Sequence, residues 1–170
     1  MKMVMDACTV ILLAKASVLE SAARQFSIFV PKSVYEEVMA GKAKKLSDAL
    51  LAEMLVKNRL ISVLAAKNAA LGESIKKDFS MGNGEADAIA LCLEKNFNAV
   101  ATDNKQGRKA APIYSIPLLG SPEIIAALAR KGAITKEKAK QALSVLRNEG
   151  WFNDLLLERV AEEVDKNARN

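Results

Sequence analysis

The sequence predicts an α/β fold with a central parallel sheet, followed by a group of C-terminal helices. Short apolar segments that read as strands alternate with helical periodicity over residues 1–117, which is typical of a parallel sheet covered by helices. After Gly120 the strand-like segments stop and three helical segments follow. A chain of 170 residues suits one domain with a small appended piece. We therefore expect a domain over 1–117 and a helical extension over 118–170, packed on that domain or on a partner.

The individual elements follow from apolar periodicity and from proline and glycine positions. Strands are expected over 2–6, 27–30, 60–64, 98–102 and 113–116, the last one stopped by Pro117. Helices are expected from Ala7, from Pro31 to Gly41, between Gly41 and Asn58, over 65–77 and 84–95, and briefly after Asp103. The C-terminal helices are expected over 121–131, 136–148 and 153–165, separated by Gly132 and by Gly150-Trp151.

Two cysteines and no histidine exclude several kinds of site. A zinc set of Cys and His, a histidine-based triad and a histidine general base all need side chains that the chain lacks. Cys8 and Cys92 are too few for a disulfide framework, which favours a reducing cytoplasm. No apolar run approaches the ~18 residues of a membrane span, and Asp6 interrupts the apolar N-terminus, which argues against a signal peptide. We therefore expect a cytoplasmic protein without a membrane segment.

The net charge of +5 is unevenly distributed. Residues 1–150 contain 22 Lys and Arg against 15 Asp and Glu, whereas residues 151–170 contain 3 against 5. A basic body with an acidic final segment is compatible with an anionic partner, and nucleic acid is the obvious candidate.

Acidic residues occur where predicted strands end and predicted helices start. Asp6 closes the first strand, and Asp103 follows a later one. Glu37 lies in one helix, and Glu85 and Asp87 fall in the first turn of another. Ligands bind beyond the carboxyl ends of the strands in open α/β sheets, so we expect these acids to meet there. Mg²⁺ and Mn²⁺ prefer oxygen ligands of this type, and such ions support phosphodiester hydrolysis without histidine.

Each of these acids also has a purely structural interpretation. Asp6 is a suitable helix N-cap, and Asp103 can form an Asx turn or a cap. Either Glu36 or Glu37 can face the site, and a helical Glu usually faces solvent.

Glu85 and Asp87 both suit the positive end of a helix dipole. They flank the apolar stripe that contains Ala86 and Ile89 on opposite sides, so they need not share one task. We favour Asp87, which lies beside the core, and take Glu85 second.

A basic segment directly follows Asp103. Lys105, Arg108 and Lys109 are placed to contact the phosphate backbone of a nucleic acid. The alternative is a solvated helix face, which is the commoner role of Lys and Arg.

Four short motifs resemble those of the PIN-domain family, the fold of many prokaryotic ribonucleases including VapC-type toxins, in the same order and at similar spacing. They are Val4-Met-Asp6, Val30-Pro-Lys-Ser-Val-Tyr-Glu-Glu37-Val, Gly84-Glu-Ala-Asp87-Ala-Ile-Ala-Leu and Ala101-Thr-Asp103-Asn. The resemblance covers residues 1 to about 117, and it is closer to an archaeal and bacterial branch whose chains continue with a helical tail.

The resemblance implies a three-layer α/β/α PIN-like fold and a Mg²⁺- or Mn²⁺-dependent endoribonuclease that cleaves RNA. The implied catalytic residues are Asp6, Glu37, Asp87 and Asp103. Asp6, Asp87 and Asp103 would hold metal, with Glu85 close by, and Glu37 would orient the attacking water or complete a second metal site. The family also suggests an antitoxin protein as partner and a homodimer.

The family pattern differs from this sequence at one position. Two residues after the first Asp the family commonly has Ser, Thr or Asn, whereas this chain has Cys8. A thiol is a poor ligand for a hard metal, although Thr9 offers a neighbouring hydroxyl.

Other classes of protein fit less well. A haloacid-dehalogenase phosphatase needs a second Asp where Cys8 stands, a response-regulator receiver needs an acidic pair at the first strand end, and Cys8 has no histidine to activate it as a nucleophile. The serious alternative is a non-catalytic PIN-like subunit that binds nucleic acid or acts as a scaffold in a larger complex.

Overall fold

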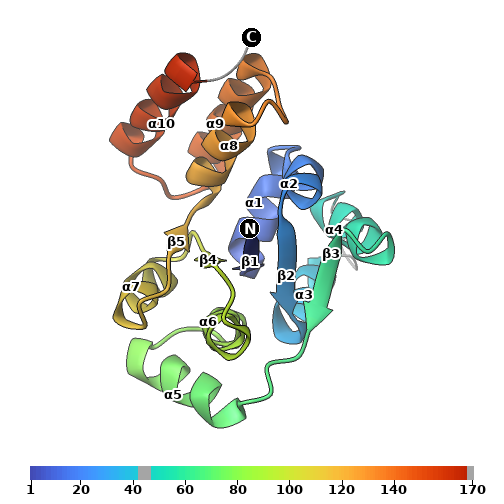
Figure 1. Cartoon of the computed structure of the whole chain (residues 1–170), viewed down its shortest axis with the longest axis vertical. Coiled ribbons are helices and arrows are strands. Elements are labelled where there is room, and N and C mark those ends of the chain that lie inside the picture. Colours follow the sequence, from blue (N-terminus) through green and yellow to red (C-terminus); the bar gives the residue numbers. More distant parts are fainter. Residues whose placement is uncertain (42–46, 168–170) are drawn as a thin grey trace.

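The computed structural model describes residues 1–41 and 47–167, and its centre is a five-stranded parallel sheet with helices on both faces (Figure 1). In chain order the elements are β1 (Lys2–Met5), α1 (Ala7–Lys15), α2 (Leu19–Gln25), β2 (Ser27–Pro31), α3 (Lys32–Ala40), α4 (Ser47–Lys57), β3 (Ile61–Leu64), α5 (Ala69–Phe79), α6 (Asn83–Lys95), β4 (Ala99–Ala101), α7 (Lys105–Ile113), β5 (Leu118–Leu119), α8 (Ser121–Arg130), α9 (Lys136–Glu149) and α10 (Asp154–Asn167).

The strand order is β3-β2-β1-β4-β5, and every neighbouring pair is parallel. The chain therefore builds outward from β1 to β3 and then returns to place β4 on the other side of β1. The connections on the two sides of this reversal diverge and leave a crevice at the carboxyl ends of β1 and β4. The expected three-layer α/β/α fold with a parallel sheet is confirmed.

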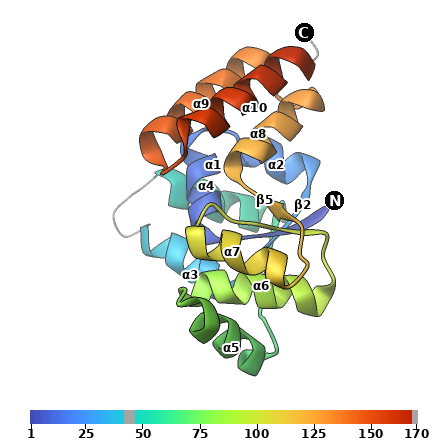
Figure 2. The same cartoon turned by 90° about the vertical axis from the view of Figure 1, so that its left-hand side faces the viewer.

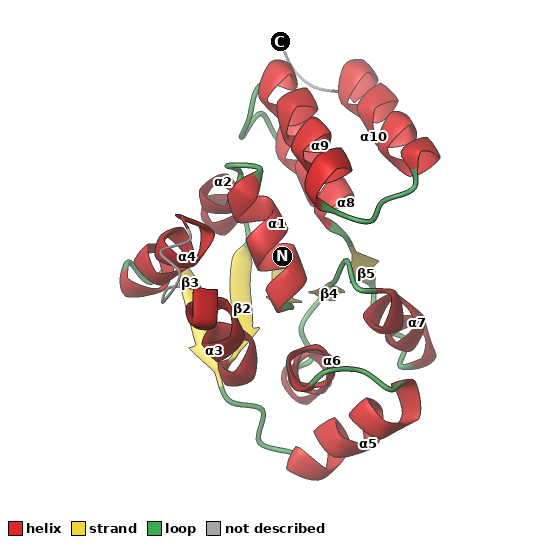
Figure 3. Ribbon diagram, turned by 180° about the vertical axis from the view of Figure 1, so that it is seen from behind, coloured by secondary structure: helices red, strands yellow, loops and turns green. Residues whose placement is uncertain are grey.

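The alternation of side chains along the strands explains the two helical layers. Met3 and Met5 of β1 point into a buried cluster with α1 to α4, whereas Val4 points into a second cluster with α5 to α7. Ala99 and Ala101 of β4 join the first cluster. Figures 1 and 3 show the two groups of helices on opposite sides of the sheet.

The helices α8, α9 and α10 lie together at one end of the molecule, and α5 lies at the other (Figure 2). The buried side chains of α8, α9 and α10, including Ile125, Leu146 and Leu157, belong to the same apolar cluster as Met3. In addition, β5 follows residue 117 and pairs with β4. The C-terminal segment therefore shares the sheet and the core of the preceding residues. None of the helices in the described part of the chain is long and apolar enough to cross a bilayer.

Three expected elements differ from the structure, and the first is the helix expected over 65–77, which begins only at Ala69 after its N-cap Asn68. The strand expected over 113–116 is wrong, because Ile113 ends α7 and the strand β5 begins only after Pro117. Ser115 has a φ of 56°, a turn conformation that lets the chain reverse direction between these two elements.

The helix expected from Ala7 is interrupted after Lys15, where Ser17 with φ of 56° separates α1 from α2. Part of the helix expected between Gly41 and Asn58 lies outside the described residues.

Candidate metal centre and nucleic-acid interface

Asp6 lies at the carboxyl end of β1 and is 1 % exposed. It is the N-cap of α1, since its Oδ1 accepts a hydrogen bond of 2.8 Å from the backbone N–H of Thr9, while the Thr102 hydroxyl donates to Oδ2. Burial raises the pKa of Asp6 to about 6, because a desolvated carboxylate favours its neutral form. The capping interpretation of Asp6 is thus confirmed, and the same carboxylate remains buried at the sheet crevice.

Asp103 follows β4 and faces the same crevice. Its Oδ1 accepts a hydrogen bond of 2.9 Å from the backbone N–H of Ser121, and its Oδ2 accepts from the Ser121 hydroxyl. Burial raises its pKa, and the Arg108 guanidinium opposes that effect. The cap of α7 is the neighbouring Asn104, whose side chain accepts from the backbone N–H of Gln106. Asp103 therefore does not cap α7, but it accepts the first backbone N–H of α8, which is a structural role at the start of that helix.

The register of β1 against β4 brings these two acids together. Met5 pairs with Ala101, so Asp6 and Thr102 are the next residues on adjacent strands, and their side chains meet. The charge of Asp103 contributes to the raised pKa of Asp6. The two carboxylates repel each other in a crevice shielded from water, and a bound cation would reduce this electrostatic repulsion.

A buried hydroxyl lies near both acids. Thr9 is fully buried, and its hydroxyl meets no well-aligned acceptor within the described residues. It nevertheless acts as a hydrogen-bond donor that lowers the pKa of both Asp6 and Asp103, so it lies within reach of both carboxylates. A hydroxyl shared between two carboxylates in this way favours their charged forms.

Glu37 and Glu85 flank the crevice from α3 and α6. The charge of Glu85 contributes to the raised pKa of Glu37, after burial. The helices approach closely at Gly84, where a Cβ would lie 3.0 Å from Glu37 Oε2. The neighbouring Glu36 pairs with Lys32 at 3.6 Å and faces solvent, whereas Glu37, which is also exposed, is the acid whose carboxylate lies beside Gly84 of α6.

Asp87 has a different environment from Glu85, although both lie in the first turns of α6. Its Oδ2 accepts a hydrogen bond from the Ser33 hydroxyl, and its Oδ1 lies 3.2 Å from the position of a Cβ on Gly72 in α5. Glu85 instead accepts a hydrogen bond of 3.0 Å from the backbone N–H of Gly82. The two acids point to opposite sides of the helix, as their spacing in the sequence predicts.

Cys8 is the residue around which the acids gather. Partial burial and, after it, the charges of Asp6, Asp103, Glu85 and Glu37 together raise the pKa of its thiol to about 12, although the residue is exposed at the surface. The thiol therefore stays protonated at neutral pH and is a poor nucleophile. Asp87 is not among these charges, so Glu85 is the acid of α6 nearest to the others.

The donors suit a hard cation only in part. Within the described residues, no three His, Cys, Asp or Glu side chains converge closely enough to hold a metal on their own. The charges of Asp6 and Asp103 interact, and each carboxylate oxygen keeps a second lone pair beyond its hydrogen bond. Mg²⁺ typically binds one or two carboxylates and keeps several waters, so this pair fits such an ion.

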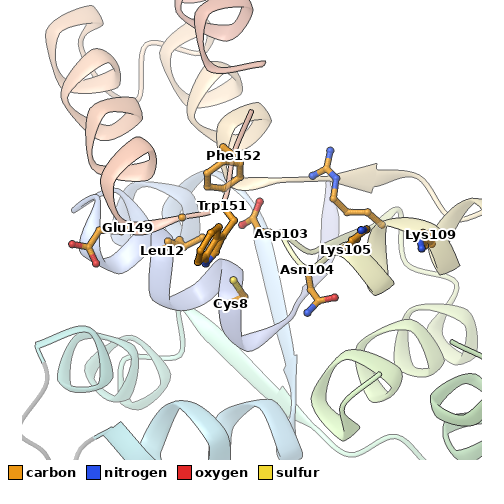
Figure 4. A pocket seen from close by; sticks show the side chains of 11 residues that line it. Cys8, Leu12, Asp103, Asn104, Lys105, Lys109, Glu149, Trp151 and Phe152 are labelled. Carbon is orange, nitrogen blue, oxygen red and sulfur yellow. The ribbon is translucent and has the colours of Figure 1, made fainter. Parts of the chain in front are cut away.

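A pocket of about 680 Å³ opens beside Asp103 and Cys8. Lys105, Arg108 and Lys109 of α7 line it on one side. The remaining lining residues are Leu12, Asn104, Glu149, Gly150, Trp151 and Phe152. Figure 4 shows Asp103 between Trp151 and Lys105. The basic segment expected next to the acids therefore lines the same pocket as one of them.

Sequence reasoning missed two groups that contribute to this site. Ser121 binds both oxygens of Asp103, and Trp151 lines the pocket beside it. Ser121 opens a helix after the last strand, which is a signal for a site at the sheet edge. The placement of Trp151 depends on how α9 and α10 pack, and no local pattern predicts that.

A parallel α/β sheet with acids at the switch between β1 and β4 defines a class of ligand-binding α/β domains. A family model described as a PIN domain matches residues 2–166. The chain belongs to the PIN-domain family, whose fold is generally that of nucleases. None of the curated proteins matches the chain.

Proposed function

We propose that the chain is a Mg²⁺- or Mn²⁺-dependent endoribonuclease. The observation that supports this proposal is the buried carboxylate of Asp6 beside the partly buried carboxylate of Asp103 at the switch point of the sheet, with the Thr9 hydroxyl within reach of both. Two desolvated acids that repel each other cost stability unless they serve a ligand. The basic pocket beside them supplies the complementary charge for a phosphate backbone.

The residues of the chain divide the tasks in this proposal. Asp6 and Asp103 hold the cation, and Thr102 and Ser121 hold those two carboxylates in place. A divalent ion at these acids would activate water and stabilise the leaving oxygen of the phosphodiester. Lys105 and its neighbours on α7 fix the phosphates of the RNA.

The third acid is open to test. Glu37 is proposed to orient the attacking water, and Glu85 to complete the metal site through water, because both lie near Cys8 together with the buried pair. Asp87 is the other candidate, and its hydrogen bond with Ser33 favours a role in fixing α3 against α6. Cleavage by Glu85→Gln and Asp87→Asn variants separates the two possibilities.

The first experiment is thermal unfolding with and without Mn²⁺. A ligand that binds only the folded state stabilises it by about 2.7 kcal/mol at a concentration 100 times its dissociation constant, which corresponds to a rise of several degrees for a chain of this size. We expect this rise in the wild type and its loss in Asp103→Asn. Equal behaviour of the two proteins would contradict a metal site at Asp103.

The second experiment is RNA cleavage with a matched pair of variants. Glu37→Gln is expected to lower cleavage by about 10- to 100-fold, as changes around a metal centre typically do. Glu36→Gln is the control, because that side chain faces solvent one position away. A wild type that binds RNA and does not cleave it with either metal would favour the non-catalytic binding or scaffold subunit.

A narrower hypothesis follows from the resemblance to VapC-type toxins. In a toxin–antitoxin pair, induction of the wild-type chain arrests growth, and Asp103→Asn relieves the arrest. Normal growth with active enzyme present would contradict the toxin role and leave the nuclease activity untouched.

A further inference from the structure

Trp151 is the single tryptophan of the chain, and its side chain is fully exposed at 105 %. It lies in the connection between α9 and α10 and packs against no part of the described structure that would cover it. Isolated apolar residues at the surface are common, but a bare indole beside a pocket with charged walls is a binding feature.

The local backbone explains why the indole is presented in this way. Gly150 is extended, with φ of −114° and ψ of 169°. The ring of Phe152 folds back onto this glycine, since a Cβ there would lie 2.3 Å from Phe152 Cε2. Both Trp151 and Phe152 line the pocket, with Phe152 packed on Gly150 and the indole of Trp151 exposed. Figure 4 shows the indole next to Leu12 and Asp103, with Cys8 beneath.

The opposite wall of the pocket is positively charged. Lys105 and Lys109 form no ion pair within the described residues, and Arg108 has only a long contact of 3.9 Å with Glu123. The acidic residue on the indole side, Glu149, is neutralised by Lys15 at 2.6 Å. The pocket thus offers an aromatic face on one side and unpaired cations on the other, with Asp103 between them.

We propose that Trp151 stacks on an unpaired nucleobase of the RNA, next to the phosphate that the acidic site would cleave. This inference rests on the proposed function and names its substrate class, which is single-stranded RNA. A base can stack on an indole only when it is not held within a duplex. The next phosphates of the same strand then reach Lys105 and Lys109. The charged surroundings favour a nucleotide over an apolar segment of a partner protein, which would leave those lysines unpaired.

Because Trp151 is the single tryptophan, its fluorescence tests the stacking proposal directly. Indole emission is recorded while a short oligoadenylate is added to the full chain, with Ca²⁺ replacing Mg²⁺ and Mn²⁺ and with the intact RNA verified on a gel. A labelled copy of the same RNA reports binding by fluorescence anisotropy. We expect the emission to be quenched with the same midpoint as the anisotropy change. An abasic oligomer of equal length, which has the phosphates and lacks the bases, is expected to bind without quenching.

Variants test the contribution of the ring. Trp151→Ala is expected to raise the dissociation constant of oligoadenylate about tenfold, or ~1.4 kcal/mol, which is within the range for one stacked base. The affinity for the abasic oligomer is expected to stay unchanged, and Trp151→Phe to restore most of the loss. Leu155→Ala is the matched control, because Leu155 is also exposed, at 73 %, and does not line the pocket.

The outcomes separate this inference from the proposed function. RNA that binds without quenching, or an equal loss of affinity for both oligomers in Trp151→Ala, would overturn stacking and leave the nuclease proposal standing. Quenching without cleavage in Mg²⁺ or Mn²⁺ would support stacking and contradict the nuclease. Emission that changes with protein concentration alone would overturn stacking in favour of a second copy of the chain on Trp151.

Discussion

Asp6 combines two roles that are usually separate at the level of single side chains. One oxygen caps α1 through Thr9, and the other accepts from Thr102, so the carboxylate is held in one orientation. The same burial that orients it makes its charge costly, as its raised pKa shows. If Asp6 serves a metal ion as proposed, it does so at the expense of the stability of the unliganded fold.

The free-energy cost of burying the Asp6 charge predicts how Asp6→Asn changes the stability of the fold. The folded state holds the proton up to about pH 6, whereas the unfolded chain releases it near the ordinary value of 3.8, so stability falls as pH rises between these values. A shift of this size corresponds to about 3 kcal/mol. In metal-free buffer we expect Asp6→Asn to be more stable than the wild type by up to this amount at pH 8, with the difference vanishing near pH 4. Denaturant titrations at both pH values measure it, and a variant less stable at pH 8 would show that the cap outweighs the charge.

Sequence patterns located the acids but not their roles. The strand-end positions of Asp6 and Asp103 are local signals, and the structure brings both to one crevice. The choice between Glu36 and Glu37 depends on the rotation of α3 against α6, a tertiary feature that a single helix does not encode. The orientation of Asp87 toward Ser33 depends on the same packing.

At the level of elements, α7 supports the acidic pair from behind. A Cβ on Gly107 would lie 2.7 Å from Thr102 Oγ1 and 2.9 Å from Thr102 Cγ2. The absence of a side chain at this point lets the helix pack against the residue that donates to Asp6. The helix α7 therefore contributes cationic side chains on its exposed side, and on its buried side it makes the close contact with Thr102.

Gly107→Ala tests this contact. Alanine is normally the better helix residue by about 1 kcal/mol, yet here the added methyl must displace a buried Thr102 side chain. We expect a net loss of about 1–3 kcal/mol together with weaker Mn²⁺-induced stabilisation. A Gly107→Ala protein as stable as the wild type would contradict this prediction.

Apolar periodicity predicted most helices and strands, since the apolar pattern within each segment continues for enough residues to be distinctive. The prediction fails at 113–116, where an apolar segment with the composition of a strand lies in a turn and β5 takes the following residues. Pro117 still participates in the sheet through its carbonyl, which accepts from the backbone N–H of Val100 at 3.0 Å. A two-residue strand is too short to leave a pattern.

At the scale of the whole molecule, the C-terminal helices belong to the architecture of the site. Ser121, the first residue of α8, binds Asp103, and the loop after α9 supplies Trp151 to the pocket. The apolar side chains of α8 to α10 continue the cluster that contains Met3 and Met5. The sequence predicts a helical extension packed on the domain or on a partner, because the pattern changes after Gly120, but that change carries no information on which surface those helices cover.

Removal of residues 118–170 tests how independent the first segment is. The shortened chain loses β5 and exposes the apolar face that α8 to α10 cover. Because a domain is stable by only about 5–15 kcal/mol, we expect residues 1–117 to lose the cooperative thermal transition and to become sensitive to protease. Circular dichroism and limited proteolysis against the full chain measure both. A sharp transition in the shortened chain would support a domain boundary at residue 117.

The hydrogen bonds from Ser121 to Asp103 have a consequence for the order in which the protein is made. Synthesis proceeds from the N-terminus, so Asp6 leaves the ribosome early, while the residue that fixes its acidic partner follows more than a hundred residues later. A nascent chain that has not yet reached Ser121 therefore carries Asp6 and Asp103 without the residue that fixes Asp103. If the chain is the nuclease proposed above, its metal centre is completed only after α8 has begun to emerge.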